Sequence, residues 1–137
     1  MKKLGLVLVC FFIFTVSISA ESLQNEDGKL AVSLESTNVE YNLGSIERGE
    51  VIHEIVWLRN NLEQPLAIKE ARSTCECIDS STDSQVVDRG EVFEVEITFD
   101  TQGISQGDAE EVIYILTENM DYEIIRLLIL ATIVDTK

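Results

Sequence analysis

The stretch EVFEVEITFD, residues 91–100, carries the clearest structural signal in the chain. From Phe93 to Phe99 every second residue is apolar, and the residues between them are glutamate or threonine. A period of two is typical of a β-strand that has one buried face and one solvated face. The sequence therefore predicts a strand here with four side chains in the core: Phe93, Val95, Ile97 and Phe99.

Similar short runs lie on both sides of this strand and are separated by turn residues. One begins near Val39, and the others are VIHEIVWLRNN at 51–61, PLAIKEA at 65–71, EEVIYILTEN at 110–119 and YEIIRLLILATIV at 122–134. About seven short strands within roughly a hundred residues predict an all-β fold, an antiparallel β-sandwich. The last run is apolar on both faces, so we expect it to lie centrally or to be covered twice. Further core side chains are expected at Val112, Tyr114, Leu127 and Ile129. Trp57 is expected in the core because large aromatics are usually mostly buried, and the alternative is an exposed strand face where it would be a binding anchor.

The N-terminus has the layout of a secretory signal peptide. Lys2 and Lys3 form a basic start, an apolar run extends from Leu4 to Val16, and small residues follow up to Ala20. We expect cleavage after Ala20 and export to the periplasm, the cell envelope or the extracellular space. The alternative is a retained membrane anchor, although the segment from Leu4 to Ala20 is at the lower limit of length for spanning hydrocarbon.

The predicted organisation is a signal peptide at 1–20, a flexible polar leader at 21–29 and one β-sandwich domain at 30–137. The full chain has 10 Lys and Arg against 25 Asp and Glu, a net charge of −15, and loss of Lys2 and Lys3 changes it to −17. Such a surface repels nucleic acid and anionic membranes, so neither is an expected partner. No cofactor-binding motif is present, and no cofactor is expected.

Several segments resemble one bacterial family: YNLGSIERGEVIHEIVWLRN at 41–60, QPLAIKEARSTCEC at 64–77, VVDRGEVFEVEITFDTQG at 86–103 and the closing apolar strand. This is the family of secreted immunoglobulin-like (Ig-like) domains of unknown function numbered 1573, related to the Hydin-type Ig-like domains. The resemblance extends from about Val39 to Val134 and implies an Ig-like β-sandwich in an exported bacterial protein. It implies no established activity.

Two positions depart from the family pattern. Glu76 stands between two cysteines where the family tends to have glycine, and its carboxylate disfavours a neighbouring thiolate, which Arg72 would partly offset. Asn61 and Leu62 follow Asn60 where the family also tends to have glycine. Asn61 can adopt a left-handed backbone, which would preserve the turn.

Cys75 and Cys77 are the candidate functional residues, since the only other cysteine, Cys10, lies in the predicted signal peptide. In an extended strand their Cα atoms would be about 6.5–7 Å apart, so a disulfide between them needs a tight bend. The sequence leaves three interpretations open: buried structural residues, a thiol-redox pair, or a clip for a soft metal such as Cu(I). Catalytic cysteines usually need a base or cation, and the single histidine, His53, lies on another strand.

The sequence therefore favours an exported, non-enzymatic Ig-like module with a protein-interaction or cell-envelope structural role, and the expected partner is another protein of the cell envelope. The alternative is thiol-redox chemistry or copper handling through the Cys75 and Cys77 pair. The acidic loop residues Asp79, Asp83 and Asp88 are expected to be solvated, because their spacing is not that of a calcium-binding loop.

Overall fold

The computed structural model describes residues 30–136. The predicted signal peptide and leader, residues 1–29, lie outside the described residues and remain predictions. The described part of the chain consists of strands, turns and loops, and it contains no helix that could cross a membrane.

Nine strands make up the described chain, two more than the expected number of about seven. The excess reflects very short edge strands of three residues, which a periodic pattern does not reveal. The strands are β1 (Val32–Leu34), β2 (Asn38–Glu47), β3 (Val51–Asn60), β4 (Leu66–Ser73), β5 (Ile78–Ser81), β6 (Gln85–Val87), β7 (Val92–Asp100), β8 (Gly107–Thr117) and β9 (Ile124–Val134).

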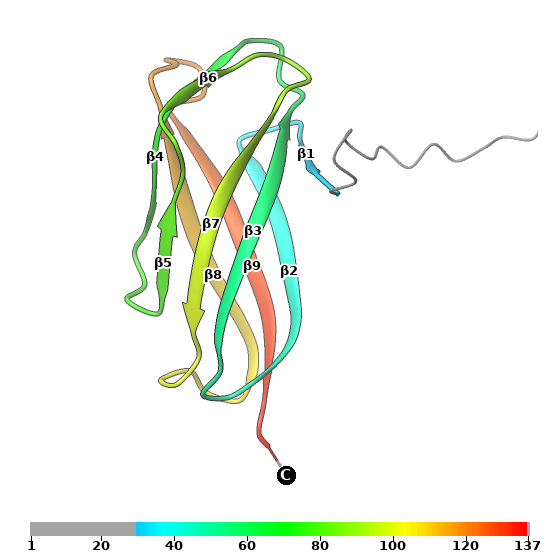
Figure 1. Cartoon of the computed structure of the whole chain (residues 1–137), viewed down its shortest axis with the longest axis vertical. Helices are drawn as coiled ribbons and strands as arrows, with labels where there is room; N and C mark the ends of the chain where they lie inside the picture. Colours follow the sequence, from blue (N-terminus) through cyan, green and yellow to red (C-terminus); the bar gives the residue numbers. More distant parts are fainter. Residues whose placement is uncertain (1–29, 137) are drawn as a thin grey trace, which may run out of the picture.

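Two sheets pack face to face (Figure 1). The four-stranded sheet has the order β1-β3-β7-β5, and the five-stranded sheet has the order β2-β9-β8-β4-β6. This arrangement confirms the predicted all-β, Ig-like sandwich. Most ladders are antiparallel, but β1 runs parallel to β3, and β2 runs parallel to β9. Each parallel ladder places an N-terminal strand beside a later one, so neither pair is a hairpin.

The core between the sheets contains most of the predicted side chains. All four expected core residues of β7 are at most 3% exposed, and so are Leu127 and Ile129 on β9. The central position of β9 is also confirmed, since it lies between β2 and β8.

The prediction for the buried face of β8 is wrong. Val112 and Tyr114 are only partly buried, whereas Ile113 and Ile115 are fully buried. The strand is apolar at every position from Val112 to Leu116, so alternation by itself does not indicate which face is inside. The packing of the four-stranded sheet against the five-stranded sheet determines which face of β8 is buried.

The outer face of the four-stranded sheet carries apolar side chains of β3. Val51 is 49% exposed and Ile55 is 43% exposed. Trp57, expected in the core, is partly buried and lies at the outward phase of the same strand. Across the ladder, Glu96 is opposite Ile55 and Glu94 is opposite Trp57. This face therefore combines apolar and acidic side chains.

A buried side chain closes the turn after β3. Asn60 is fully buried, and its amide nitrogen donates to the carbonyl oxygens of Gln64 and Val87 at 3.0 Å each. Its side-chain oxygen accepts from the N–H of Leu62 at 3.0 Å. The left-handed backbone considered for Asn61 is not used, because only glycines among the described residues have positive φ. The turn therefore depends on an asparagine side chain.

Candidate functional site

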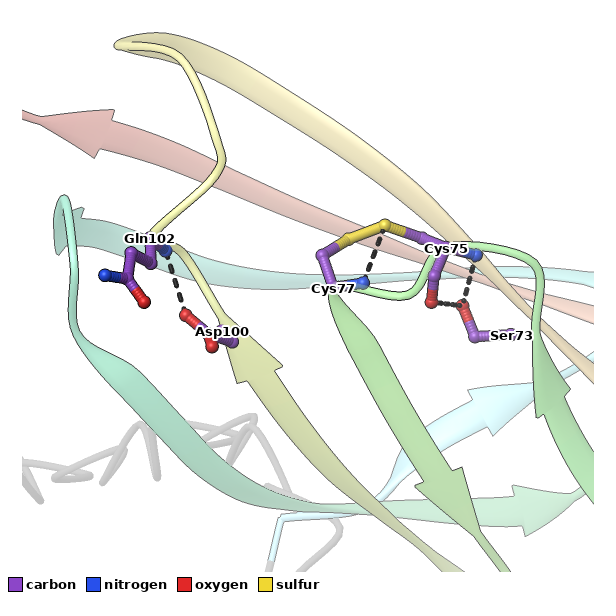
Figure 2. Close-up of a disulfide and its surroundings, with 5 residues drawn as sticks. All are labelled: Ser73, Cys75, Cys77, Asp100 and Gln102. Atoms are coloured by element: carbon purple, nitrogen blue, oxygen red, sulfur yellow. Dashed lines mark hydrogen bonds between the residues drawn. A yellow bond between two sulfur atoms is a disulfide. The ribbon is translucent and has the colours of Figure 1, made fainter.

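The two cysteines lie in the loop where the chain passes from one sheet to the other (Figure 2). β4 ends at Ser73 in the five-stranded sheet, and β5 begins at Ile78 in the four-stranded sheet. A disulfide joins Cys75 to Cys77, whose Cα atoms are 5.1 Å apart. This separation is shorter than in an extended strand, which agrees with the tight bend that the sequence required.

Hydrogen bonds hold this bend in place. The N–H of Cys75 donates to Oγ of Ser73 at 3.1 Å, and the N–H of Ile78 donates to the carbonyl of Cys75 at 3.2 Å. The N–H of Asp100 donates to the carbonyl of Cys77 at 2.9 Å and ties the loop to the end of β7. The N–H of Cys77 donates to Sγ of Cys75 at 3.1 Å (Figure 2), so a thiolate at Cys75 would have a backbone donor.

One carboxylate faces the disulfide, that of Glu111 on β8. An oxygen of Glu111 and the sulfur atoms of Cys75 and Cys77 all lie within 4.8 Å of one another, and all three residues are partly buried. The register explains this proximity: Ser73 pairs with Ile113 in an antiparallel ladder, so two residues later Cys75 comes beside Glu111. No other group of three His, Cys, Asp or Glu side chains in the described chain comes this close together.

The charged groups considered from the sequence face elsewhere. His53 lies on the exposed face of β3, where its Nδ1 is 3.1 Å from Oγ1 of Thr98. Arg72 is exposed and forms an ion pair with Glu70 at 2.7 Å. Glu111 was missed because the wrong face of β8 was predicted to point into the core. The face that does point inward carries Ile113, and Glu111 lies on that same face.

The disulfide is a weak constraint on the fold. It closes a loop of only three residues, which stabilises a chain by about 1.5 kcal/mol in the loop-entropy description. Two extensive sheets and a continuous core already hold β4 and β5. Loss of this bond is therefore expected to leave the sandwich folded.

The same cluster is a poor copper site. Reduced Cys75 and Cys77 would offer soft thiolates, but the third group, Glu111, is a hard oxygen ligand that suits Cu(I) badly. The acidic loop residues considered for calcium are all exposed, as expected: Asp79, Asp83 and Asp88.

A separate polar contact joins the sheets at the edge formed by β2 and β3. The hydroxyl of Tyr41 donates to Oε1 of Glu54 at 2.7 Å. Burial and this bond to the Glu54 carboxylate raise the pKa of Tyr41 to about 12. Tyr41 is therefore protonated at neutral pH, and the contact is a structural link between the sheets.

A sequence profile described as "Protein of unknown function (DUF1573)" matches residues 34–133. No curated protein matches the chain. Among solved structures, the fold is similar to a protein of unknown function from Porphyromonas gingivalis W83. The TM-score is 0.55 at 17% identity, over 68% of this chain and 43% of that one.

Two further solved structures are similar to the chain. The secreted serine protease VesC from Vibrio cholerae matches with a TM-score of 0.53 at 10% identity, over 70% of this chain and 22% of VesC. The PapD-like domain 7 of human CEP192 matches with a TM-score of 0.48 at 13% identity, over 73% of this chain and 84% of that domain. The chain spans less than half the length of the two bacterial structures, and identities this low show the fold alone.

Proposed function

The chain belongs to the DUF1573 family of proteins of unknown function, and we propose that it is an exported, non-enzymatic module that binds another protein of the cell envelope. It would be related to the Hydin-type Ig-like domains and would lose residues 1–20 on export. The observation that supports binding is the open edge of β3, together with the apolar side chains beside it.

On the side away from β7, the ladder to β1 covers only Leu58 to Asn60 of β3. From Val51 to Ile55, the described strands supply no ladder partner on that side. An open strand edge presents N–H and C=O groups that an extended segment of another protein can pair with. The adjacent Val51 and Ile55 side chains, both more than 40% exposed, would then pack beside side chains of that segment on the same face.

The proposed partner is basic and extended, which the chemistry of the surface supports. Glu94 and Glu96 lie on the neighbouring strand of the same outer face, and the whole chain carries a net charge of −15. Long-range attraction would steer a basic segment to this surface, and apolar contact with Ile55 would hold it. Binding of this kind weakens as salt is raised.

Replacing Ile55 tests the proposed edge. Ile55→Lys places a charge among the exposed apolar side chains of β3 and should weaken partner binding by at least about tenfold. Little effect on the free energy of unfolding is expected, because the position is exposed. The matched control is Val86→Lys, an equivalent change at a 66% exposed position on β6 of the other sheet. Tagged wild-type protein and both variants would be exposed to cell-envelope extract, and the retained proteins compared by mass spectrometry.

We expect a protein that wild type and Val86→Lys retain and that Ile55→Lys loses. In the complex, hydrogen exchange of the amides from Val51 to Ile55 should slow down. Equal retention by all three forms would rule out this edge, and no reproducible partner at all would count against the binding module itself.

A second candidate function, thiol–disulfide exchange with exported proteins, has support from the Cys75–Cys77 bond. The bond joins residues two apart, contributes little to the fold, and lies in a loop that is only partly buried. Exchange would be stoichiometric: a dithiol of another exported polypeptide would reduce the pair and become a disulfide.

The double variant Cys75→Ser, Cys77→Ser tests this candidate. It should unfold with a free energy within about 1.5 kcal/mol of wild type, because the closed loop is short. Wild type should gain two alkyl groups in intact-mass measurements after mild reduction and none before. The candidate is rejected if wild type reacts identically before and after reduction, or if the variant retains all thiol-exchange activity.

A further inference from the structure

We propose that Glu111 is the proton acceptor and donor for disulfide exchange at Cys75 and Cys77, and that the substrate is a dithiol on an exported polypeptide. The inference rests on the second candidate function and assigns a chemical role to the carboxylate beside the pair. It depends on three features: the proximity of Glu111, the packing of Cys77, and the hydrogen bond to Cys75.

Glu111 has the position that proton transfer needs. Its carboxylate oxygen is within 4.8 Å of both sulfur atoms, close enough for a small shift, or one water, to complete a hydrogen bond to either. Antiparallel pairing of β4 with β8 holds the backbone of Glu111 beside the loop. Its neighbour Glu110 lies on the opposite face of β8, is paired with Leu130 of β9, and is exposed.

The two sulfur atoms have different surroundings. Cys77 packs against the hydrophobic core, where an unprotonated thiolate would be costly because it is poorly solvated. Cys75 lies in the loop before it, and its Sγ accepts the N–H of Cys77 at 3.1 Å. Because Cys77 packs against the core and Cys75 does not, Sγ of Cys75 is the sulfur that a nucleophile reaches first. The thiolate released from Cys77 is then the less stable of the two, so the sulfur of Cys77 needs a proton as it leaves.

The first half of the exchange follows from these positions. A substrate thiol passes its proton to the Glu111 carboxylate, and the resulting thiolate attacks Sγ of Cys75. A mixed disulfide forms, the Cys75–Cys77 bond breaks, and Sγ of Cys77 leaves with the electron pair. Glu111 returns the proton to that sulfur, so Cys77 ends as a thiol.

In the second half, the other substrate thiol passes its proton to Glu111 and attacks the substrate sulfur of the mixed disulfide. The substrate disulfide forms, and Sγ of Cys75 leaves with the electron pair, stabilised by the N–H of Cys77. Glu111 then protonates Cys75. The substrate has lost two electrons, the protein pair has gained them, and Glu111 is again a carboxylate.

The test compares Glu111→Gln with Glu110→Gln, which removes the same charge from the outer face of the same strand. Dithiothreitol is the probe, and the fraction of reduced protein is followed by alkylation and intact mass as a function of pH. At about pH 6 we expect Glu111→Gln to react at least about tenfold more slowly than wild type, because little free thiolate is available there. The difference should shrink as pH rises and dithiothreitol ionises unaided, while Glu110→Gln follows wild type throughout.

Glu111→Asp keeps the carboxylate and should recover part of the rate, which a purely structural role would not predict. Thermal unfolding of each variant checks that it is folded. The inference is overturned if Glu111→Gln matches Glu110→Gln, or if it reacts faster than wild type because a repelling charge has been removed. If folded wild type reacts no faster than a free peptide of residues 72–79, the thiol-exchange function fails as well. If wild type is reduced faster than the peptide and the Glu111 variants are reduced at the same rate as wild type, only the role of Glu111 is overturned.

Discussion

Phe99→Ala should lower the free energy of unfolding by about 4 kcal/mol and the melting temperature by roughly 20 °C. Phe99 is 1% exposed and lies in register between Ile52 on β3 and Ile78 on β5. Both neighbours belong to regular ladders, so they cannot collapse into the space that the ring leaves. The cost of the cavity therefore adds to the loss of apolar burial. Thermal and denaturant unfolding measure the change.

The control for this prediction is Glu96→Ala on the same strand. Glu96 is exposed on the opposite face, so its removal should change the unfolding free energy by no more than about 0.5 kcal/mol. A loss below about 1 kcal/mol for Phe99→Ala would mean that the side chain does not occupy a packed core.

Asn60→Ala should destabilise the protein by about 3 kcal/mol, an unusually large effect for a polar residue at the end of a strand. The substitution leaves the carbonyls of Gln64 and Val87 and the N–H of Leu62 without this partner. Asn60 is fully buried, so water does not readily replace the lost hydrogen bonds. Chemical denaturation measures the loss, and hydrogen exchange should show faster opening of the β3–β4 turn.

Asn61→Ala is the matched control, because the same side chain is removed one residue later. Asn61 is only partly buried, and its amide donates to Oγ of Ser33, so water can take over the contact. Asn61→Ala is expected to lower the free energy of unfolding by less than about 1 kcal/mol. Equal losses for the two variants would show that burial of Asn60 is not what makes it important.

The strand pattern was readable from the sequence wherever one face is apolar and the other polar. β7 satisfies this condition, and its four predicted core residues are all buried. β3 also alternates, and its Ile52, Val56 and Leu58 side chains lie on its inward face. Trp57 belongs to the other face, although its size suggested the core.

On β8 the wrong face was predicted to be buried, and this single error had two consequences. Because both faces are apolar, Val112 and Tyr114 were assigned to the core in place of Ile113 and Ile115. The same assignment turned Glu111 outward, so the carboxylate beside the disulfide was not foreseen. Core and candidate site were missed together because alternate residues of one strand always share a face.

The sequence by itself determined the all-β fold, the position of the principal strand, and the condition that a disulfide between Cys75 and Cys77 needs a tight bend. Each of these depends on residues that are close in the chain, through the two-residue period of a strand and the short reach of a disulfide. Only the tertiary structure decided which face of β8 is buried and which carboxylate faces the cysteines. Glu111 is 36 residues after Cys75, and the β4–β8 ladder alone brings them together. Local periodicity describes one strand at a time, whereas the partner of a strand depends on how the sheets assemble.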